Sequence, residues 1–446
     1  MTEDTRHRVA GRAAVIGRRL GIDRLSDPAG RRWDWWVPLC LLAIIVASDY
    51  KFRLRPPNET VGGNADPFVL AEIAIYLTVG AFCVLRYGRA PRPTRSTALV
   101  FFAYAFVAVL VLSATYAPYP QLAVVRAAQL VVVVVLTRCI AKHAGRDQLH
   151  WFAHAFAVLV AGSVVFGVAF PLPHAQADQG RFSWLFVHPV MAGVFLGIAT
   201  TIVVGYLLGH RAERPGPRWH PVVYLVLLAI VGGGLVATQT RGAVLGAVVG
   251  LTVLGWSHWR GRRKIEITLV GAVFAGLLAV AATPAVLAFF ERGETASKLA
   301  TLNSRTDLWA QAWQFFLQKP LYGWGLESTR GLFLDTIGLG GGHNALVNLL
   351  VDGGLVAAGS WIALIVTLVV TLYRIRASVV PDRAMLLGLV TFLLVDGMFV
   401  ESLGAAANVA STWLFVIVAW AEILRARSEP VAAPERVAVA TPVRPR

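Results

Sequence analysis

The chain has 446 residues, of which 57% are hydrophobic and only 15% are charged. Soluble globular proteins carry about a quarter charged residues, so this composition excludes an ordinary soluble protein. The formal net charge of +16 is also common among nucleic-acid-binding proteins, but membrane topology accounts for its distribution, and no nucleic-acid partner is expected.

Apolar runs of about twenty residues recur along the chain, and in a bilayer such runs are helical because every backbone polar group must be satisfied internally. We therefore predict an all-α, polytopic membrane protein with about twelve transmembrane helices. The tenth span is long, and Gly353-Gly354 predicts a break within it. The predicted spans are 34–50, 67–87, 97–115, 121–140, 149–171, 184–209, 220–239, 241–258, 265–289, 343–374, 383–400 and 405–424.

The basic residues predict the orientation. About 30 of the 41 Lys and Arg residues lie in the N-terminus, the C-terminal tail and alternate loops, which are therefore expected in the cytoplasm. This distribution favours a multi-pass bacterial inner-membrane protein with both termini cytoplasmic. The expected domains are a basic N-terminus at 1–33, a transmembrane catalytic domain at 34–424 with a periplasmic loop at 290–342, and a disordered tail at 425–446.

Four arginines contradict this charge pattern because they fall on the predicted outer face: Arg126, Arg181, Arg241 and Arg305. Each one alone is explained by a side chain that reaches the lipid headgroups. As a set they would repel one another unless an anion lay among them, and the guanidinium fork suits phosphate. We interpret them as ligands of a lipid-linked phosphate or pyrophosphate.

The long outer loop contains a predicted helix at about 305–318. Trp309, Trp313 and Phe316 recur at helical spacing and form an apolar stripe. This stripe faces either the membrane surface or the bundle of spans. We do not assign the tryptophans a catalytic role.

A glycine-rich segment ends at His343 and Asn344, where the tenth span begins on the outer face. A helix N-terminus attracts anions and disfavours a positive imidazole. We therefore predict that His343 is neutral and acts as a general base, with Asn344 among the pyrophosphate ligands. The alternative is a histidine that only caps the helix.

Other candidates carry less information. His188 precedes Pro189 and either lines the same cavity or marks a kink. Four acids in or near spans either act in catalysis or pair with the arginines; they are Glu72, Asp352, Asp396 and Glu401. The sequence has no metal-ligand cluster and no nucleotide-binding motif, so no metal or other cofactor is expected and the substrate must already be activated.

Several motifs, in their order and spacing, resemble the O-antigen ligase and polymerase superfamily. Thr240-Arg241-Gly242 is similar to its Ser-Arg-Gly turn, with Thr in place of Ser, and His188-Pro189 matches its middle span. The remaining motifs are Asn303-Ser-Arg305-Thr-Asp-Leu-Trp309, Lys319-Pro-Leu-Tyr-Gly323-Trp-Gly325 and His343-Asn-Ala-Leu-Val-Asn-Leu-Leu-Val-Asp-Gly353.

The resemblance implies a metal-independent, inverting glycosyltransferase of the bacterial inner membrane that acts at the periplasmic face. Its donor would be a glycan on undecaprenyl pyrophosphate, and its acceptor a sugar hydroxyl of the lipid A–core oligosaccharide. The family's catalytic His and essential Arg match His343 and Arg241, and its loop Arg matches Arg305. Arg126 and Arg181 rest on the topology argument.

Three alternatives stay open at the level of sequence. An O-antigen polymerase would use another lipid-linked glycan as acceptor, and a protein O-oligosaccharyltransferase would use a Ser or Thr. The modest outer loop and the lack of an appended domain favour the ligase over both. A transporter of a lipid-linked anion would need polar residues on both sides of a central path, whereas the candidates here lie on one face.

Overall fold

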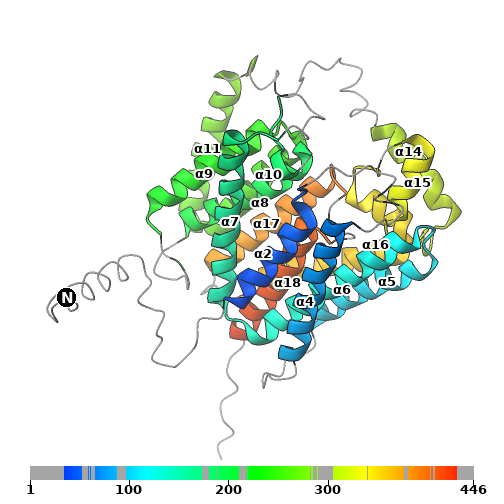
Figure 1. Cartoon of the computed structure of the whole chain (residues 1–446). Helices are drawn as coiled ribbons and strands as arrows, with labels where there is room; N and C mark the ends of the chain where they lie inside the picture. The colour runs from blue at the N-terminus through cyan, green and yellow to red at the C-terminus, as the bar shows by residue number, and fades with distance from the viewer. Residues whose placement is uncertain are drawn as a thin grey trace, which may run out of the picture.

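A computed structural model of the chain describes residues 35–52, 66–87, 97–172, 180–186, 188–209, 219–281, 305–338, 340–375, 380–401, 403–404 and 407–428, and the isolated positions 59, 61, 217, 283, 284 and 289. Within these ranges every regular element is a helix, which confirms the predicted all-α class (Figure 1). The predictions for the N-terminus at 1–33 and for the loop at 290–304 lie outside the described residues.

Each predicted span overlaps a helix, although α11 ends at 281 where the predicted span ends at 289, and α8 begins at 189 where the predicted span begins at 184. The twelve helices are α2 (Trp36–Asp49), α4 (Pro67–Tyr87), α5 (Ala98–Ser113), α6 (Pro120–His143), α7 (Arg146–Ala169), α8 (Pro189–Leu208), α9 (Pro221–Ala237), α10 (Arg241–His258), α11 (Gly261–Ala281), α16 (Ala345–Arg374), α17 (Val380–Gly397) and α18 (Val409–Ser428). In the described part of the chain, seven helices are long and apolar enough to cross a membrane, and α2 and α9 are shorter apolar helices. The polytopic membrane class is confirmed, and twelve crossings stay a prediction.

Local sequence explains where several helices begin. Proline occupies the first position of α6, α8 and α9, where the missing N–H costs no hydrogen bond. At α8 the preceding residue, His188, accepts a hydrogen bond from the backbone N–H of Val190 through Nδ1, at 3.2 Å. At the other end of the chain α18 continues to Ser428, so residues 425–428 of the predicted disordered tail are helical, and the rest of that prediction, at 429–446, lies outside the described residues.

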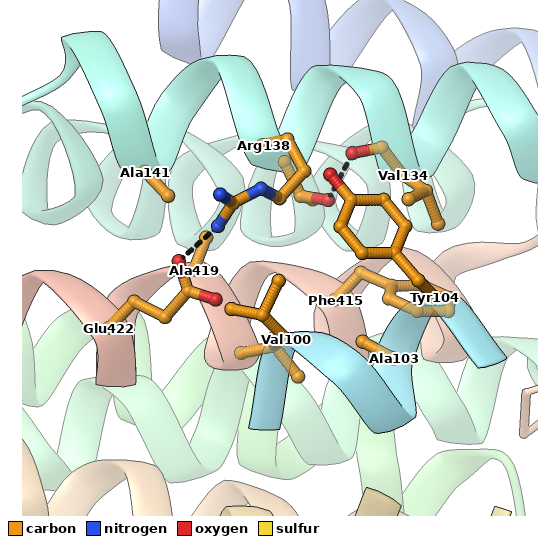
Figure 2. A pocket seen from close by; sticks show the side chains of 11 residues that line it. Val100, Ala103, Tyr104, Val134, Arg138, Ala141, Phe415, Ala419 and Glu422 are labelled. Carbon is orange, nitrogen blue, oxygen red and sulfur yellow. Dashed lines mark hydrogen bonds and ion pairs between the residues drawn. The ribbon is translucent and has the colours of Figure 1, made fainter. Parts of the chain in front are cut away.

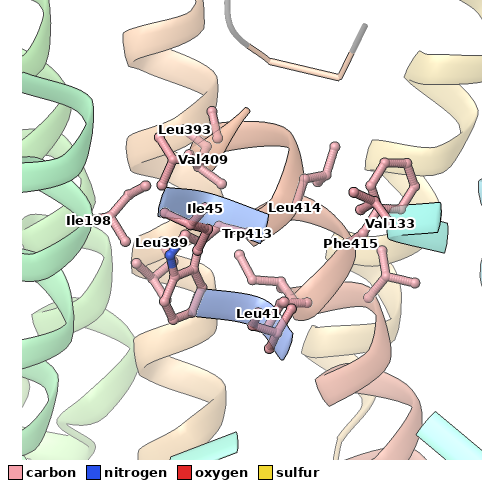
Figure 3. Close-up of a cluster of buried hydrophobic side chains, with 14 of the residues drawn as sticks. Leu41, Ile45, Val133, Ile198, Leu389, Leu393, Val409, Trp413, Leu414 and Phe415 are labelled. Carbon is pink, nitrogen blue, oxygen red and sulfur yellow. The ribbon is translucent and has the colours of Figure 1, made fainter. Parts of the chain in front are cut away.

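The core of the bundle surrounds α18. Trp413 is fully buried there among aliphatic side chains from α2, α8 and α17, including Leu41, Ile198 and Leu389 (Figure 3). Beside it, α10 and α17 approach closely because glycines face each other. A Cβ on Gly250 would lie 2.8 Å from the carbonyl oxygen of Gly388, so a larger residue there would force the helices apart.

Polar pairs cross-link the helices at the end of the bundle where α6 and α18 finish. Arg138 of α6 donates to Glu422 of α18 at 2.5 Å, in a narrow pocket lined by α5, α6 and α18 (Figure 2). Nearby, Arg146 at the start of α7 forms a buried ion pair with Asp382 of α17. Both pairs join helices that are distant in sequence.

Two further helices, α14 (Arg305–Gln318) and α15 (Ser328–Ile337), lie over the opposite end of the bundle, which we call the loop-helix end (Figure 1). The predicted loop helix coincides with α14, and α15 was not predicted. The buried face of α14 contains Leu308, Ala312, Phe315 and Phe316. The predicted stripe divides between its two alternatives, because Phe316 is buried against the bundle and Trp313 is 52% exposed.

The predicted break in the tenth span lies at Gly354, whose φ of 61° and ψ of −161° divide α16 into two segments. The connector between α14 and α15 satisfies the backbone groups that the break leaves without helical partners. Trp324 N–H donates to Val351 O at 2.8 Å, and Leu355 N–H donates to Pro320 O at 2.9 Å. The loop helices are therefore attached to both halves of α16.

Candidate active site

A cavity of about 280 Å³ lies at the loop-helix end of the bundle. Five of the seven residues predicted from sequence line it: Arg181, His188, Arg241, Arg305 and His343. The remaining lining residues are Val190, Thr240, Gly242, Phe399 and Val400. Residues from the middle and the last third of the sequence thus share one cavity.

Four helices begin at this cavity. Arg241 and Arg305 are the first residues of α10 and α14, and His188 immediately precedes α8. His343 lies two residues before α16. Because helix N-termini carry unpaired N–H groups and partial positive charge, their convergence adds to the attraction of the arginines for an anion.

The turn between α9 and α10 positions two of the arginines. Arg181 donates from Nε to the carbonyl oxygen of Thr238 at 2.8 Å and from Nη2 to Thr240 Oγ1 at 3.3 Å. The Thr240 hydroxyl in turn donates to the carbonyl oxygen of Pro189, at 3.0 Å. The Thr240 hydroxyl thus bridges Arg181 and the start of α8, and a serine hydroxyl could do the same. Because Arg241 follows Thr240, this bridge also fixes its position relative to α8.

Charges of both signs act on Arg305, from Arg241 and from the acids Glu401 and Asp396. Its guanidinium carbon lies 5.6 Å from the centre of the Phe399 ring. Burial lowers the pKa of Arg305 and the nearby charge of Arg241 lowers it further, while Glu401 opposes the shift. Among the described residues Arg305 makes no hydrogen bond, so its donors remain available to an anion in the cavity.

His343 is held by Glu401. The Nδ1 atom of His343 lies 3.1 Å from Oε2 of Glu401. For Nδ1 to donate to the carboxylate, a neutral imidazole must carry its lone pair on Nε2. The position of the carboxylate beside Nδ1 therefore favours the tautomer that can accept a proton at Nε2.

The structure corrects the expected electrostatics of His343. The helix N-terminus was expected to favour the neutral imidazole, but Glu401 opposes this. The alternative that His343 only caps the helix is wrong, because Asn344 caps α16. The hydrogen bond to Glu401 raises the pKa of His343, although burial and Arg305 oppose the shift. Burial raises the pKa of Glu401, but the hydrogen bond and charge of His343 outweigh it and lower that pKa overall.

Two predicted ligands do not line the cavity. Asn344 Oδ1 accepts hydrogen bonds from the backbone N–H groups of Leu346 and Val347, and Asn344 Nδ2 donates to Met398 O at 3.1 Å. Its side chain thus caps α16 and ties it to the end of α17. Arg126 lies in a separate cluster, where it donates to Gln129 at 2.8 Å and approaches Glu72 at 3.9 Å.

The four acids named from sequence have different surroundings. Glu401 contacts the cavity histidine, and Asp396 is buried in α17, where its charge acts on Arg305. Asp352 accepts hydrogen bonds from the backbone N–H and the hydroxyl of Thr329, both at 2.6 Å, and so anchors α15 to α16. Among the described residues no three His, Cys, Asp or Glu side chains lie close enough together to hold a metal ion.

Sequence reasoning did not identify the partnership of His343 with Glu401, nor Phe399 and Val400 as lining residues. The last two follow α17 and carry no polar signal. Glu401 was recognised only as an acid that could pair with an arginine. Its partner is His343, which lies before α16, whereas Glu401 follows α17. The hydrophobic periodicity of these two spans does not predict that contact.

The comparisons with known proteins point to one family. Residues 223–362 match the family model Wzy_C, described as O-antigen ligase. No curated protein matches the chain. The matched segment runs from α9 into α16 and contains Arg241, Arg305 and His343. This match confirms the resemblance that the motifs predicted and supports an O-antigen ligase family protein.

Proposed function

We propose that this protein is a glycosyltransferase that transfers a polymerised glycan from undecaprenyl pyrophosphate to a sugar hydroxyl of lipid A–core. The single observation that carries the proposal is the cavity in which three arginines face a histidine held by a carboxylate. The arginines supply an anion site, and His343 supplies a base. This combination suits the displacement of a pyrophosphate by a hydroxyl.

The proposed reaction is a single displacement. Nε2 of His343 accepts the proton of the acceptor hydroxyl while its oxygen forms a bond to the anomeric carbon. The bond from that carbon to the pyrophosphate oxygen breaks, and the electron pair leaves with the lipid pyrophosphate. Glu401 stabilises the imidazolium that forms, because the carboxylate lies against Nδ1.

The leaving group is stabilised by the guanidinium groups of Arg181, Arg241 and Arg305. Negative charge on the pyrophosphate increases as the glycosidic bond breaks, so fixed cations act more strongly on the transition state than on the ground state. The N-termini of α8, α10 and α14 add partial positive charge at the same place. His188 lines this site through an exposed ring beside Val190.

The proposed topology places this cavity at the periplasmic face of the inner membrane, with both termini in the cytoplasm. The loop segments at the loop-helix end carry few basic residues, whereas the opposite end carries most of them. A lipid-linked donor would reach the cavity from the outer leaflet. The proposed substrates are undecaprenyl-pyrophosphate-linked glycan and lipid A–core.

The same chemistry would serve an O-antigen polymerase or a protein O-oligosaccharyltransferase with a different acceptor. A transporter is disfavoured because the arginines and the histidine gather at one end rather than along a path through the bundle. In a deletion strain, core without O-antigen together with accumulated polymerised donor supports a ligase. Core with a single repeat supports a polymerase.

The direct test uses the purified protein in nanodiscs with undecaprenyl-pyrophosphate-linked glycan and lipid A–core. The wild-type protein should join the two, and His343→Ala should fold normally but give no product. Arg262→Ala is the control, because Arg262 is exposed on α11 and lies outside the cavity. Transfer by His343→Ala at the wild-type rate would refute the proposed base.

A further inference from the structure

Two side chains hold Gly342, the residue before the proposed base. Trp309 of α14 donates from Nε1 to the carbonyl oxygen of Gly342 at 2.9 Å. Asn348 of α16 accepts from the backbone N–H of Gly342 through Oδ1, at 3.0 Å. Two separate helices therefore bind both polar backbone groups of Gly342, although neither helix contains His343.

The backbone of His343 is strained and needs such support. Its φ of 49° lies in the left-handed region, which residues with a side chain rarely adopt. The carbonyl group of Gly342 belongs to the peptide plane that leads into His343, so the bond from Trp309 restrains the plane from which this φ is set. A strained conformation persists only where the surrounding structure holds it. The bond from Trp309 is thus one of the contacts that keep His343 in place.

The segment before His343 is closely packed against the group that holds the base. A Cβ on Gly342 would lie 2.8 Å from Oδ1 of Asn348. A Cβ on Gly341 would lie 3.1 Å from Nδ2 of Asn348 and 3.4 Å from the carboxylate carbon of Glu401. The backbone of these two glycines therefore lies against Asn348 and beside Glu401, and a shift of this segment would change how His343 meets its carboxylate.

The same helix carries an arginine of the cavity. Arg305 and Trp309 lie four residues apart on α14, so their side chains project from the same face of the helix. Arg305 lines the cavity, and Trp309 reaches the segment before His343. One rigid element thus carries a proposed pyrophosphate ligand and a contact that supports the proposed base.

A second tryptophan of the loop helices makes the same kind of bond elsewhere. Trp324 donates from Nε1 to the carbonyl oxygen of Phe315 at 2.9 Å. Both tryptophans are partly buried against one cluster of apolar side chains, which contains Leu308, Ala312, Phe315, Phe333 and Val351. Of these two bonds, only that of Trp309 reaches the residue before His343. Trp324 is therefore a matched control for the loss of an indole N–H.

We propose that Trp309 is a positioning residue for the base: its indole N–H holds the Gly342 carbonyl, so the placement of His343 against Glu401 depends on α14. This proposal rests on the proposed function, in which His343 accepts the proton of the acceptor. Trp309 itself touches no reacting atom. Asn348 supports the same geometry through the other polar group of Gly342.

The first test measures transfer by the full-length protein in nanodiscs, with donor and acceptor varied in turn. Trp309→Phe and Trp324→Phe each keep an aromatic ring and remove one indole N–H. Trp309→Phe should lower kcat about tenfold or more, because a small misplacement of a reacting group is costly. Its donor KM should stay within about twofold, because the arginines still bind the ground state. Trp324→Phe should change neither constant by more than about twofold.

The second test does not depend on transfer. Diethyl pyrocarbonate modifies the neutral imidazole, so its rate of reaction with His343 against pH, followed by mass spectrometry of the modified peptide, reports the pKa of His343. The charged groups that act on this pKa are Glu401, whose hydrogen bond raises it, and Arg305, which opposes the shift. Trp309→Phe should loosen the contact with Glu401, so the reaction profile of His343 should move to lower pH.

His188 is the internal control in the second test, because the backbone N–H of Val190 in α8 binds its ring. Its profile should be the same in the wild-type protein and in Trp309→Phe. Asn348→Ala releases the N–H of Gly342 and should move the His343 profile in the same direction as Trp309→Phe. It serves as the second variant if Trp309→Phe yields little folded protein.

An unchanged His343 profile in both Trp309→Phe and Asn348→Ala would overturn the proposal, whatever happens to kcat. Equal losses of kcat in Trp309→Phe and Trp324→Phe would also overturn it, because they would assign both tryptophans to the packing of the loop helices. If the wild-type protein transfers no glycan but Trp309→Phe still shifts the His343 profile, the proposed function fails and the positioning role stands.

Discussion

Glu401 Oε2 lies 3.1 Å from His343 Nδ1, although His343 precedes α16 and Glu401 follows α17. A neighbouring contact holds these two segments together, since Asn344 Nδ2 donates to Met398 O at 3.1 Å. The residue that caps α16 thus also fixes the position of α17's end. The geometry of the proposed base depends on this junction, and substitutions there test it.

Glu401→Gln should slow transfer and change its pH dependence. A general base acts only when it is unprotonated, so the rate rises with pH through the pKa of His343. The hydrogen bond to Glu401 raises that pKa. Its loss lowers the pKa, so the rising limb of the profile should move to lower pH. The plateau rate should fall about tenfold or more, but less than the roughly 10²–10⁴-fold expected on removal of the base itself.

The measurement is kcat against pH for the wild-type protein and Glu401→Gln. Glu266→Gln is the control, because Glu266 is exposed on α11 and pairs only with Arg262 at 2.8 Å among the described residues. A shift of the rising limb to higher pH in Glu401→Gln would contradict the assigned role. If the pH profile of kcat is unchanged and only the yield of folded protein falls, Glu401 has a structural role and does not act on His343.

Arg305→Lys and Arg241→Lys should each lower kcat by about 10²–10³, because lysine keeps the charge but cannot reproduce a two-pronged contact with a phosphate. The donor KM should change less than kcat, since the contact strengthens as charge develops on the leaving group. The measurement is steady-state transfer with donor varied. Activity close to wild type in both variants would exclude an arginine clamp on the pyrophosphate.

Much of this site was predictable because its signals are local. Arg241 and Arg305 were identified because each breaks the charge pattern of its own loop, and His343 because it precedes a span. The break at Gly354 was predicted from two adjacent glycines. In each instance a few neighbouring residues determine the local backbone conformation or the side of the membrane, and the packing of the bundle is compatible with it.

The failures concern lateral position. Charge patterns assign Arg126 to a face of the membrane but do not say which helices surround it, and α6 places it outside the cavity, beside Gln129 and Glu72. The α15 helix was missed because it is only 10 residues long and starts after Glu327, a left-handed residue with no side-chain cap. Tertiary contacts, not local preference, stabilise it.

Gly354→Ala should destabilise the protein and disturb the site. A Cβ at Gly354 would lie 2.4 Å from the backbone of Leu321, and its φ of +61° strains any other residue. The strain alone is about 1–3 kcal/mol, and the clash adds to it. Gly359→Ala in the second half of α16 is the matched control, because its Cβ would meet nothing within 4 Å.

Thermal unfolding in detergent, followed by loss of the monodisperse chromatographic peak, should show a lower midpoint for Gly354→Ala and an unchanged or higher midpoint for Gly359→Ala. Folded Gly354→Ala should also lose transfer activity, because the connector at Pro320 and Leu321 carries the loop helices that hold Arg305. Equal unfolding midpoints for the two variants would contradict this prediction, because they would mean that the connector at Leu321 can move away from the added Cβ at little cost in stability.

The ion pair between Arg146 and Asp382 should contribute to stability and not to chemistry, because it lies at the end of the bundle remote from the cavity. Arg146 donates from Nη2 to Asp382 at 2.7 Å, and the Nε2 atom of His150 lies 3.2 Å from the same carboxylate. The side chain of Arg146 is 8% exposed and that of Asp382 is 1% exposed. Removing one partner of a buried pair costs about 3–5 kcal/mol, since the other charge stays buried.

Arg146→Ala should therefore lower the unfolding midpoint strongly, whereas Arg262→Ala should not, because the Arg262–Glu266 pair is solvent-exposed and such pairs contribute about 0–1 kcal/mol. The folded fraction of Arg146→Ala should keep the wild-type kcat and both KM values. The double variant Arg146→Met, Asp382→Leu should regain part of the lost stability, because neither charge is then left without its partner. If the double variant is less stable than Arg146→Ala, the contacts of Asp382 with His150 and with Trp420 Nε1 at 3.2 Å outweigh its pairing with Arg146.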